Sequence, residues 1–338
     1  MTADTELRVI DAPAIRGLTF RRLRAGPERA ADCAAMAEVA AAANIADRIP
    51  WVPTGGSLAA ELDHDPTTDP AADVILAEVD GLPVAWVQAD RAVRDGRWVH
   101  GLRGHVHPDW RRRGLGRALL RANIARAREL AAGRRAAPPV LEVDAEETET
   151  AALALYESEG FRAVRWFHLM RRPLIQPIPD APMPGGVEVR PVEPEQHPAI
   201  HAAENEAFRD HWGHREETPA DLRATLEQPE LDAGLWQVAW DGDQVAGVVQ
   251  NWIWRHENER LGIRRGWLER VSVRRAWRRR GLARALIARS LVLLREHGMD
   301  DAMLGVDSDN PHGALGLYTG LGFELDQRSA AYRRPLDP

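Results

Sequence analysis

The sequence is poorest in lysine and cysteine: it has no lysine among its 338 residues and one cysteine, Cys33. A single thiol can form neither an intrachain disulfide nor a metal cluster of thiolates. Because all 44 basic residues are arginines, a lysine nucleophile or general base is excluded as well. No apolar run approaches the ~18 residues of a membrane-spanning helix, and the N-terminal segment is acidic where a secretory signal is basic. We therefore expect a cytoplasmic protein with no membrane partner.

Positive charge is also scarce relative to negative charge. The chain carries 51 acidic residues against 44 arginines, which gives a net charge of −7. Nucleic-acid-binding domains usually carry a net positive charge, so the composition argues against a nucleic-acid partner. Hydrophobic residues make up 44% of the chain, which is enough to form folded cores. At roughly 100–200 residues per domain, the length predicts about two domains.

The most informative feature that is present is an internal repeat. One copy starts at His107 and reads HPDWRRRGLGRALLRANIARARE. The other starts at Arg274 and reads RRAWRRRGLARALIARSLVLLRE, with the two tryptophans 167 residues apart. Downstream lie LYESEGF and LYTGLGF, in which Tyr156 and Tyr318 are 162 residues apart. Because the order and the spacing both repeat, we conclude that one domain of roughly 150–170 residues occurs twice.

A linker separates the two copies. Residues 173–186 read PLIQPIPDAPMPGG and hold five prolines and two glycines. Such a segment cannot continue a helix or lie inside a sheet. The sequence therefore predicts a first domain over residues 1–172 and a second over residues 187–338.

Both halves show the same order of expected elements. Two β-rich runs flank Asp80-Gly81 in the first half and Asp241-Gly242-Asp243 in the second, which indicates a hairpin in each. A further strand, an arginine-rich loop, a helix of 3.6-residue apolar period and another strand follow. The tail at 323–333 is expected to form a final hairpin. The pattern predicts an α/β fold in which each half has a mixed sheet, antiparallel at its start as in α+β proteins and parallel at a later crossover.

The arginine–glycine loop between strand and helix has the chemistry of an anion site. Backbone N–H groups at a helix N-terminus attract anions, glycine allows close approach, and arginine adds charge-assisted hydrogen bonds to phosphate. A solvated turn is the plainer interpretation, but the loop occurs twice in the same context. The residues concerned are Arg111, Arg112, Arg113, Gly114, Leu115, Gly116 and Arg117 in the first half, and Arg278, Arg279, Arg280, Gly281, Leu282, Ala283 and Arg284 in the second.

This combination of motifs resembles a known family. An R-x-x-G-x-G/A loop between strand and helix, followed by a strand and an L-Y-x-x-x-G-F segment, is similar to the GNAT superfamily of acetyl-CoA-dependent N-acetyltransferases. The resemblance covers both halves, which implies two fused GNAT-like domains in tandem. Among tandem members, the segments AFRDHWGHRE and VDSDNPHGALGLYTGLGF resemble those of mycothiol synthases.

The resemblance implies acetyl-CoA as the acyl donor, with a binding site in each half. In the family, the loop and the helix N-terminus hold the pyrophosphate, and the backbone of the preceding strand binds the pantetheine arm. The corresponding strand positions are Val106 in the first half and Val271 and Val273 in the second. Relatives often have an asparagine near coenzyme A, and Asn310 stands at that place.

The resemblance also implies direct attack of a primary amine on the thioester. The amine must lose a proton, and Glu269, on the strand before the second loop, is the candidate base. A tyrosine hydroxyl can protonate the departing thiolate, and Tyr318 and Tyr156 stand at the family's tyrosine position. The plainer interpretations are a surface glutamate paired with an arginine, and tyrosines that pack against a helix.

The two halves are not equivalent in these residues. Counting back from the arginine loop places Leu102 where the second half has Glu269, and His100 and His105 are nearby substitutes. We therefore expect the second domain to catalyse and the first to be degenerate. The first can still bind acetyl-CoA because its loop is intact.

Candidate acceptor-binding residues cluster in two segments of the second half, and these residues are His211, Trp212, His214 and Glu216, with Trp252 and Trp254 on a strand. Together they suggest an aromatic pocket with acid and imidazole at its rim, which suits an amine. Core packing is the alternative for each tryptophan. The two histidines lack a third ligand, so no metal site is expected.

The sequence thus predicts an N-acetyltransferase that acts on a small-molecule amine. The acceptor is an amino sugar, an amino-acid derivative or a compound like a mycothiol precursor. Two alternatives stay open, an inactive acyl-CoA-binding sensor or scaffold and a protein N-terminal acetyltransferase. Either a monomer or a homodimer is compatible with the sequence.

Overall fold

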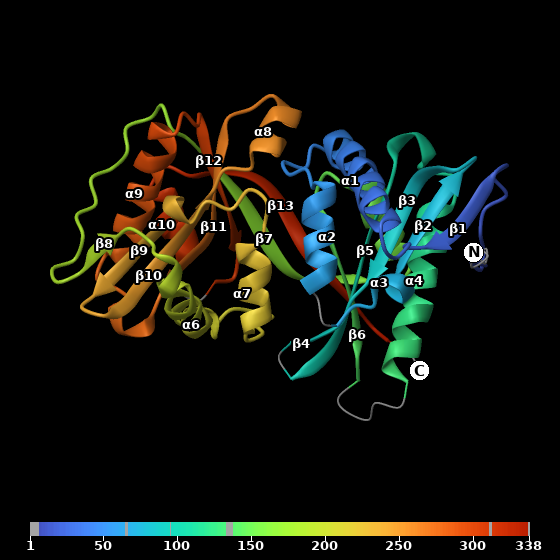
Figure 1. Ribbon diagram of the computed structural model, residues 1–338, viewed down its shortest axis with the longest axis horizontal. Helices are drawn as coiled ribbons and strands as arrows, with labels where there is room; N and C mark the ends of the chain where they lie inside the picture. The colour runs from blue at the N-terminus through green and yellow to red at the C-terminus, as the bar shows by residue number, and fades with distance from the viewer. Residues whose placement is uncertain (1–6, 65–66, 95, 133–137, 311–312, 337–338) are drawn as a thin grey trace. The chain divides into compact units, whose positions relative to one another are not determined.

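The chain forms two compact units, each with a sheet and helices packed on it (Figure 1). The computed structural model describes residues 7–64, 67–94, 96–132, 138–310 and 313–336. Unit 1 comprises Met1–Val164 with Ala330–Pro338, and unit 2 comprises Arg165–Ser329. The mixed α/β sheet that the sequence predicts in each half is confirmed.

Unit 1 is built on strands in the order β1-β2-β3-β5-β6-β13, with β4 beside β5. The pairs from β1 to β5 are antiparallel, whereas β5 and β6 are parallel. The strands are β1 (Leu18–Arg22), β2 (Val74–Val79), β3 (Leu82–Ala89), β4 (Ala92–Arg94), β5 (Arg97–Val106), β6 (Val140–Glu146) and the end of β13 (Glu324–Pro335). The helices are α1 (Glu28–Asp47), α2 (Gly55–His64), α3 (Pro70–Asp73), α4 (Leu115–Ala131) and α5 (Thr150–Ser158).

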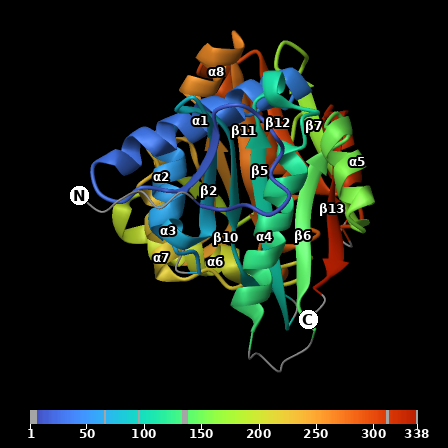
Figure 2. The same cartoon turned by 90° about the vertical axis from the view of Figure 1, so that its right-hand side faces the viewer.

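Alternation along the strands directs side chains to two helix layers in unit 1. Trp86 on β3 lies under α1, where its indole Nε1–H donates to the carbonyl oxygen of Met36 over 2.9 Å. Its neighbours Ala85 and Val87 belong instead to the core that contains Leu119 of α4. Because successive residues of a strand point to opposite faces, α1 and α4 cover opposite faces of the sheet (Figure 2).

Unit 2 repeats this plan with strands in the order β7-β12-β11-β10-β9-β8. Again one central pair, β11 and β12, is parallel. The strands are β7 (Arg162–Pro173), β8 (Glu188–Arg190), β9 (Gln237–Asp241), β10 (Gln244–Trp252), β11 (Arg265–Val273) and β12 (Asp301–Asp307). The helices are α6 (His197–Phe208), α7 (Pro219–Leu226), α8 (Arg255–Leu261), α9 (Leu282–Glu296) and α10 (Ala314–Thr319).

Turn chemistry explains the hairpins that the sequence predicts. Asp80 and Gly81 join β2 to β3 with φ values of 50° and 81°. A two-residue turn with positive φ at both positions matches the twist of the flanking strands, and Asp-Gly adopts it readily. Gly242, with φ of 58°, lies in the turn that joins β9 to β10.

Each half of the chain gives its last strand to the other unit. β7 follows α5 of unit 1, yet Phe167–Pro173 pair antiparallel with Asp301–Asp307 of β12 in unit 2. β13 follows α10 of unit 2, and its end belongs to unit 1. There Tyr332 and Leu336 pack in one core with Phe161. The units are therefore not made from contiguous halves.

Two expectations differ from this arrangement. The tail expected as a hairpin is one strand, because ELDQRSAAYRRP contains no glycine or asparagine to form a tight turn. The division into residues 1–172 and 187–338, with a linker at 173–186, describes the two sequence repeats and stays a prediction. The compact units have other bounds because of the exchanged strands.

The strand that returns to unit 1 can be tested with Leu336→Ala. Leu336 is 7% exposed and lies in the core with Phe161, so its truncation should destabilise unit 1 by roughly 2–4 kcal/mol. Hydrogen exchange should show the loss of protection on β6, whose neighbour in the sheet is β13. Leu325→Ala is the matched control, since Leu325 lies near the start of β13 with 41% exposure, whereas Leu336 directly follows the end of that strand. Equal effects of both variants would contradict the strand assignment.

Candidate functional site

The parallel strands of each unit pair briefly and then separate. β5 and β6 pair only where Val99, His100 and Gly101 meet Val140–Glu142, although β5 runs on to Val106. β11 and β12 likewise pair over three residues and then continue apart. Backbone N–H and C=O groups along the separated edges lack strand partners there, and they can bond a ligand that enters the gap.

The arginine loop follows the separated strand in each unit and has the same backbone conformation in both. A short 3₁₀ helix comes first, Pro108–Trp110 in unit 1 and Arg275–Trp277 in unit 2. Arg112 and Arg279 then adopt positive φ values of 62° and 61°, and the glycines that begin α4 and α9 follow with 91° and 84°. The first N–H groups of α4 and α9 have no partner within the helix, which is the geometry that an anion site requires, and phosphate binding by these loops stays a prediction.

The leading arginine of each loop is bound inside the protein. Both Nη atoms of Arg111 lie 2.7 Å from the carboxylate of Asp47 at the end of α1, and its Nε–H donates to the carbonyl oxygen of Val106. In unit 2, Arg278 donates to the carbonyl oxygens of Val273, at 2.9 Å, and Ala207, at 2.9 Å.

Asp210 is the carboxylate partner of Arg278, as Asp47 is of Arg111. Its carboxylate accepts from Arg278 over 3.2 Å and also pairs with Arg275. These hydrogen bonds hold the pKa of Asp210 at about 2. The leading arginines therefore fasten the unit 1 loop to the end of α1 and the unit 2 loop to the end of α6. The exposed second and third arginines, Arg112 and Arg113 with Arg279 and Arg280, stay the predicted phosphate contacts.

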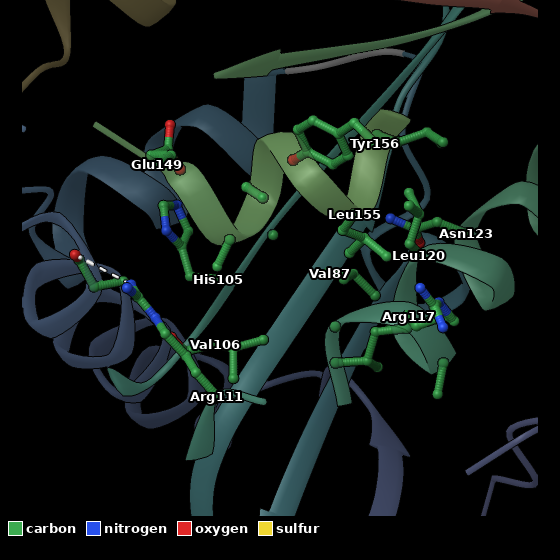
Figure 3. A pocket seen from close by; sticks show the side chains of 18 of the residues that line it. Val87, His105, Val106, Arg111, Arg117, Leu120, Asn123, Glu149, Leu155 and Tyr156 are labelled. Atoms are coloured by element: carbon green, nitrogen blue, oxygen red, sulfur yellow. Dashed lines mark hydrogen bonds between the residues drawn. The ribbon is translucent and has the colours of Figure 1, made fainter. Parts of the chain in front are cut away.

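A cavity of about 610 Å³ opens between the separated strand and the loop of unit 1 (Figure 3). Its walls come from β3, β5, the end of α1, the start of α4 and α5, with the small side chains of α5 facing it. The polar residues that line it include Asp47, Arg103, His105, Arg111, Arg117, Asn123, Glu149 and Tyr156. An elongated ligand with an anionic end fits this combination of an apolar groove and a helix N-terminus.

Burial shifts the pKa of His105 and of Glu149, which both line this cavity. The pKa of His105 falls to about 4, because the ring is buried and Arg103 and Arg111 are close. The pKa of Glu149 rises to about 7 because of burial, partly offset by a hydrogen bond from the backbone N–H of Glu146. At neutral pH His105 is thus uncharged and Glu149 is partly protonated. From the sequence, His105 is expected only as a substitute for a carboxylate, and Glu149 is not distinguished from the acidic residues around it.

Each of the two predicted tyrosines packs against a phenylalanine. Tyr156 on α5 lies 5.9 Å from Phe161 between ring centroids, and Tyr318 on α10 lies 6.0 Å from Phe323. Burial raises the pKa of Tyr318 to about 12 and also raises that of Tyr156. Both hydroxyls therefore keep their protons at neutral pH, as a proton donor must.

Glu269 is an extra residue in its strand. On β11, Arg270 pairs with Gln250 and Leu268 pairs with Asn251, which leaves Glu269 between them without a partner. This β-bulge falls where β11 leaves β12, and bulges often redirect a side chain beside an active site. The side chain is exposed along one side, and the surrounding protein raises its pKa.

Unit 1 has no counterpart of this residue. On β5, Arg103 pairs with Gln88 and Leu102 with Ala89, in unbroken register. Leu102 therefore corresponds to Leu268, and the count that placed it opposite Glu269 was wrong by the one residue that the bulge adds. A similar count from the strand ends makes Glu149 the counterpart of Asn310, since each lies three residues after β6 or β12.

The predicted acceptor residues fall into two groups. Trp254 donates its indole Nε1–H to Oε1 of Glu269 over 3.0 Å, whereas Trp252 is buried in a core with Trp267 and Met303. In the segment after α6, the ring of His211 lies 4.6 Å from Phe208 and that of Trp212 lies 6.0 Å from Phe167, between centroids. The N–H of His214 donates to the carbonyl oxygen of His211, and Glu216 is exposed.

A buried ionic cluster that the sequence did not reveal involves Arg270, the residue after Glu269. Glu204 on α6 is 2% exposed and accepts from the side chain of Gln250 over 2.7 Å. Arg270 lies 3.4 Å from Glu204 and donates to Glu217 over 2.7 Å, which ties the segment after α6 to β11. Burial raises the pKa of Glu204 to about 7. A glutamate on the apolar face of α6, one turn from Ile200, was the available signal.

Comparison with known proteins places both units in one family. The Acetyltransferase (GNAT) family model matches residues 197–323, and an Acetyltransferase (GNAT) domain model matches residues 70–163. A mycothiol acetyltransferase of Salinispora arenicola is 34% identical over 268 residues, which are 78% of this chain and 82% of the relative. In the described part of the chain, no helix combines the length and apolarity needed to cross a membrane.

Solved structures agree in fold. A GCN5-related N-acetyltransferase from Sphaerobacter thermophilus matches 95% of this chain and 96% of its own, with a TM-score of 0.67 and 26% identity. A tandem GNAT protein from the clavulanic acid biosynthesis pathway matches 95% of this chain and 99% of its own, with a TM-score of 0.68 and 18% identity. The resemblance inferred from the sequence is confirmed: the chain belongs to the GNAT family of acetyltransferases, and is an acyltransferase with two such domains in tandem whose acyl donor is acetyl-CoA.

Proposed function

We propose that unit 2 transfers the acetyl group of acetyl-CoA to the primary amine of a small molecule. The observation that carries this proposal is the bulge at Glu269, which presents a carboxylate where two parallel strands separate. Tyr318 supplies a protonated hydroxyl, and the loop that starts at Arg278 supplies a helix N-terminus for the pyrophosphate. A thioester, an amine and both proton-transfer groups can then meet in one gap.

The transfer makes one bond and breaks another. The amine nitrogen bonds to the thioester carbon, and the carbon–sulfur bond breaks after a tetrahedral oxyanion has formed. Glu269 takes a proton from the amine, and Tyr318 gives one to the departing thiolate. A backbone N–H on the free edge of β11, near Val271, can stabilise the oxyanion. No covalent enzyme intermediate is needed.

Unit 1 binds a second acetyl-CoA without turning it over in this proposal. Its loop repeats the backbone conformation of the other loop, and its cavity of about 610 Å³ lies along Val106 of β5. It lacks the bulge and therefore lacks a carboxylate at that position. His105, with a pKa of about 4, is too weak a base to replace it at neutral pH.

The names of relatives suggest the acceptor. Because the Salinispora protein is a mycothiol acetyltransferase, we propose the unacetylated precursor of mycothiol as the amine for this chain. Carboxylates near the site, Glu269 and Glu217 among them, suit a cationic amine that is still protonated when it arrives. A protein N-terminus as the acceptor, or an acyl-CoA sensor without turnover, is the alternative. Cytoplasmic location and a monomeric or homodimeric state stay predictions.

Calorimetric titration with acetyl-CoA should give two sites per chain. Both loops offer helix N-termini and exposed arginines, so each unit should contribute one site. Replacing Arg279 and Arg280 together with alanine should weaken one site about tenfold or more, through loss of charge-assisted bonds. The matched double variant of Arg112 and Arg113 should weaken the other site alone. A single site would contradict the role of unit 1, and no binding would contradict both.

Substitutions at the proposed proton-transfer groups should separate the units. Glu269→Gln and Tyr318→Phe should each lower kcat about 100-fold or more while acetyl-CoA still binds. Tyr156→Phe is the matched control in unit 1 and should leave kcat unchanged. Turnover should be measured with the mycothiol precursor, glucosamine and a short peptide as acceptors. Loss of activity in Tyr156→Phe alone would move the chemistry to unit 1.

A further inference from the structure

Trp254 makes a directed contact with the bulge carboxylate that the family motifs do not include. It comes two residues after β10 ends at Trp252 and stands at the N-cap of α8. Its indole Nε1–H donates to Oε1 of Glu269 over 3.0 Å. An indole N–H is a donor only, so this bond favours the ionised carboxylate and cannot remove its proton.

The indole is held in place from two sides. Its ring stacks on that of Trp252, with 4.5 Å between centroids and 20° between planes. Trp252 is 5% exposed and anchored in a core with Trp267 and Met303. The backbone carbonyl of Trp254 also accepts from the N–H of Asn258, in the first turn of α8. The donor therefore keeps its orientation before any ligand binds.

Two opposing effects act on the carboxylate. The Glu269 side chain is exposed, but partial desolvation by the surrounding protein raises its pKa, and the hydrogen bond from Trp254 lowers it. The charged groups on neighbouring elements have other partners: Arg270 is paired with Glu204 and Glu217, and the acidic Glu257 of α8 accepts an indole N–H. β10 contains no ionisable residue. The hydrogen bond from the indole thus offsets part of the desolvation.

Unit 1 lacks both members of this pair. Asn251 of β10 corresponds to Ala89 of β3, because both pair with equivalent leucines. Three residues further on, unit 2 has Trp254 and unit 1 has Ala92. The carboxylate and its donor are therefore present together in one unit and absent together from the other.

We propose that Trp254 is a positioning residue for the transfer reaction, whose indole holds Oε1 of Glu269 and leaves Oε2 to take the proton of the amine. This inference rests on the proposed function, in which Glu269 is the base. It gives Trp254 a second role besides the predicted one of lining an acceptor pocket. The bulge places the carboxylate, and the stacked indole orients it.

The test is the pH dependence of kcat, with the mycothiol precursor as acceptor. Trp254→Phe keeps an aromatic ring and removes the N–H, so the pKa of Glu269 should rise. Because the base must be ionised, activity is lost as pH falls through that pKa, and the acid limb should move up by about one pH unit. At high pH, kcat should return to within a few-fold of the parent. Ionisation of the amine affects the pH profile of every variant equally, so it does not contribute to the difference between a variant and the parent.

Trp277→Phe is the matched control. Trp277 makes the same kind of bond, from its indole Nε1–H to Asp241 over 2.9 Å, outside the core that supports Trp254, and its removal should not move the limb. Trp254→Gln restores a side-chain N–H, so its limb should return toward that of the parent. Thermal unfolding identifies any variant that fails to fold. If Trp254→Phe does not fold, Trp254→Gln is compared with the parent instead.

The outcomes separate this inference from the proposed function. A uniform loss of kcat in Trp254→Phe with no movement of the limb would mean a structural role and overturn the inference. Full activity in Glu269→Gln would overturn the proposed function and the inference with it. If both hold, Trp254→Phe should cause no further loss in the Glu269→Gln background, because the two residues act as one unit.

Discussion

The separation of two parallel strands is the constraint on which the rest of each unit depends. β5 and β6, like β11 and β12, pair for three residues and then diverge, which removes hydrogen bonds from the middle of a sheet. Such a gap is stable only if other contacts brace it. The arginine that leads each loop does this, since it joins the end of the strand to an aspartate at the end of α1 or just after α6. The loop that follows is therefore held in position before a ligand arrives.

The same frame carries different chemistry in the two units. In unit 2 one extra residue in β11 presents a carboxylate beside a stacked indole, which donates a hydrogen bond to it. In unit 1 the register is unbroken, and the gap contains a neutral histidine and a glutamate with a pKa of about 7. The contacts of Arg111 with Asp47 and of Arg278 with Asp210 hold the strands and loops in both units, and they involve none of the residues that differ in the gaps.

Much of this could be predicted from the sequence, and the failures have physical reasons. The repeat, the arginine loops and the hairpin turns depend on local residue types, so they were visible. The equivalence of Leu102 with Leu268 was not, because a bulge inserts a residue without changing the apolar pattern on either side. The cluster of Glu204, Arg270 and Glu217 joins a helix to a strand far along the chain. The exchanged strands could not be foreseen either, since a strand alternates in the same way whichever sheet it enters.

The exchanged strands also bear on how such a chain can evolve. A duplicated gene usually leaves each copy free to be lost, since either product folds alone. Here β7, encoded in the first copy, completes the second sheet, and the end of β13 completes the first. Deleting either copy would remove a core strand from the one that survives. A copy without catalysis, as proposed for unit 1, would therefore be retained by selection on folding, and its cavity would be free to acquire another use.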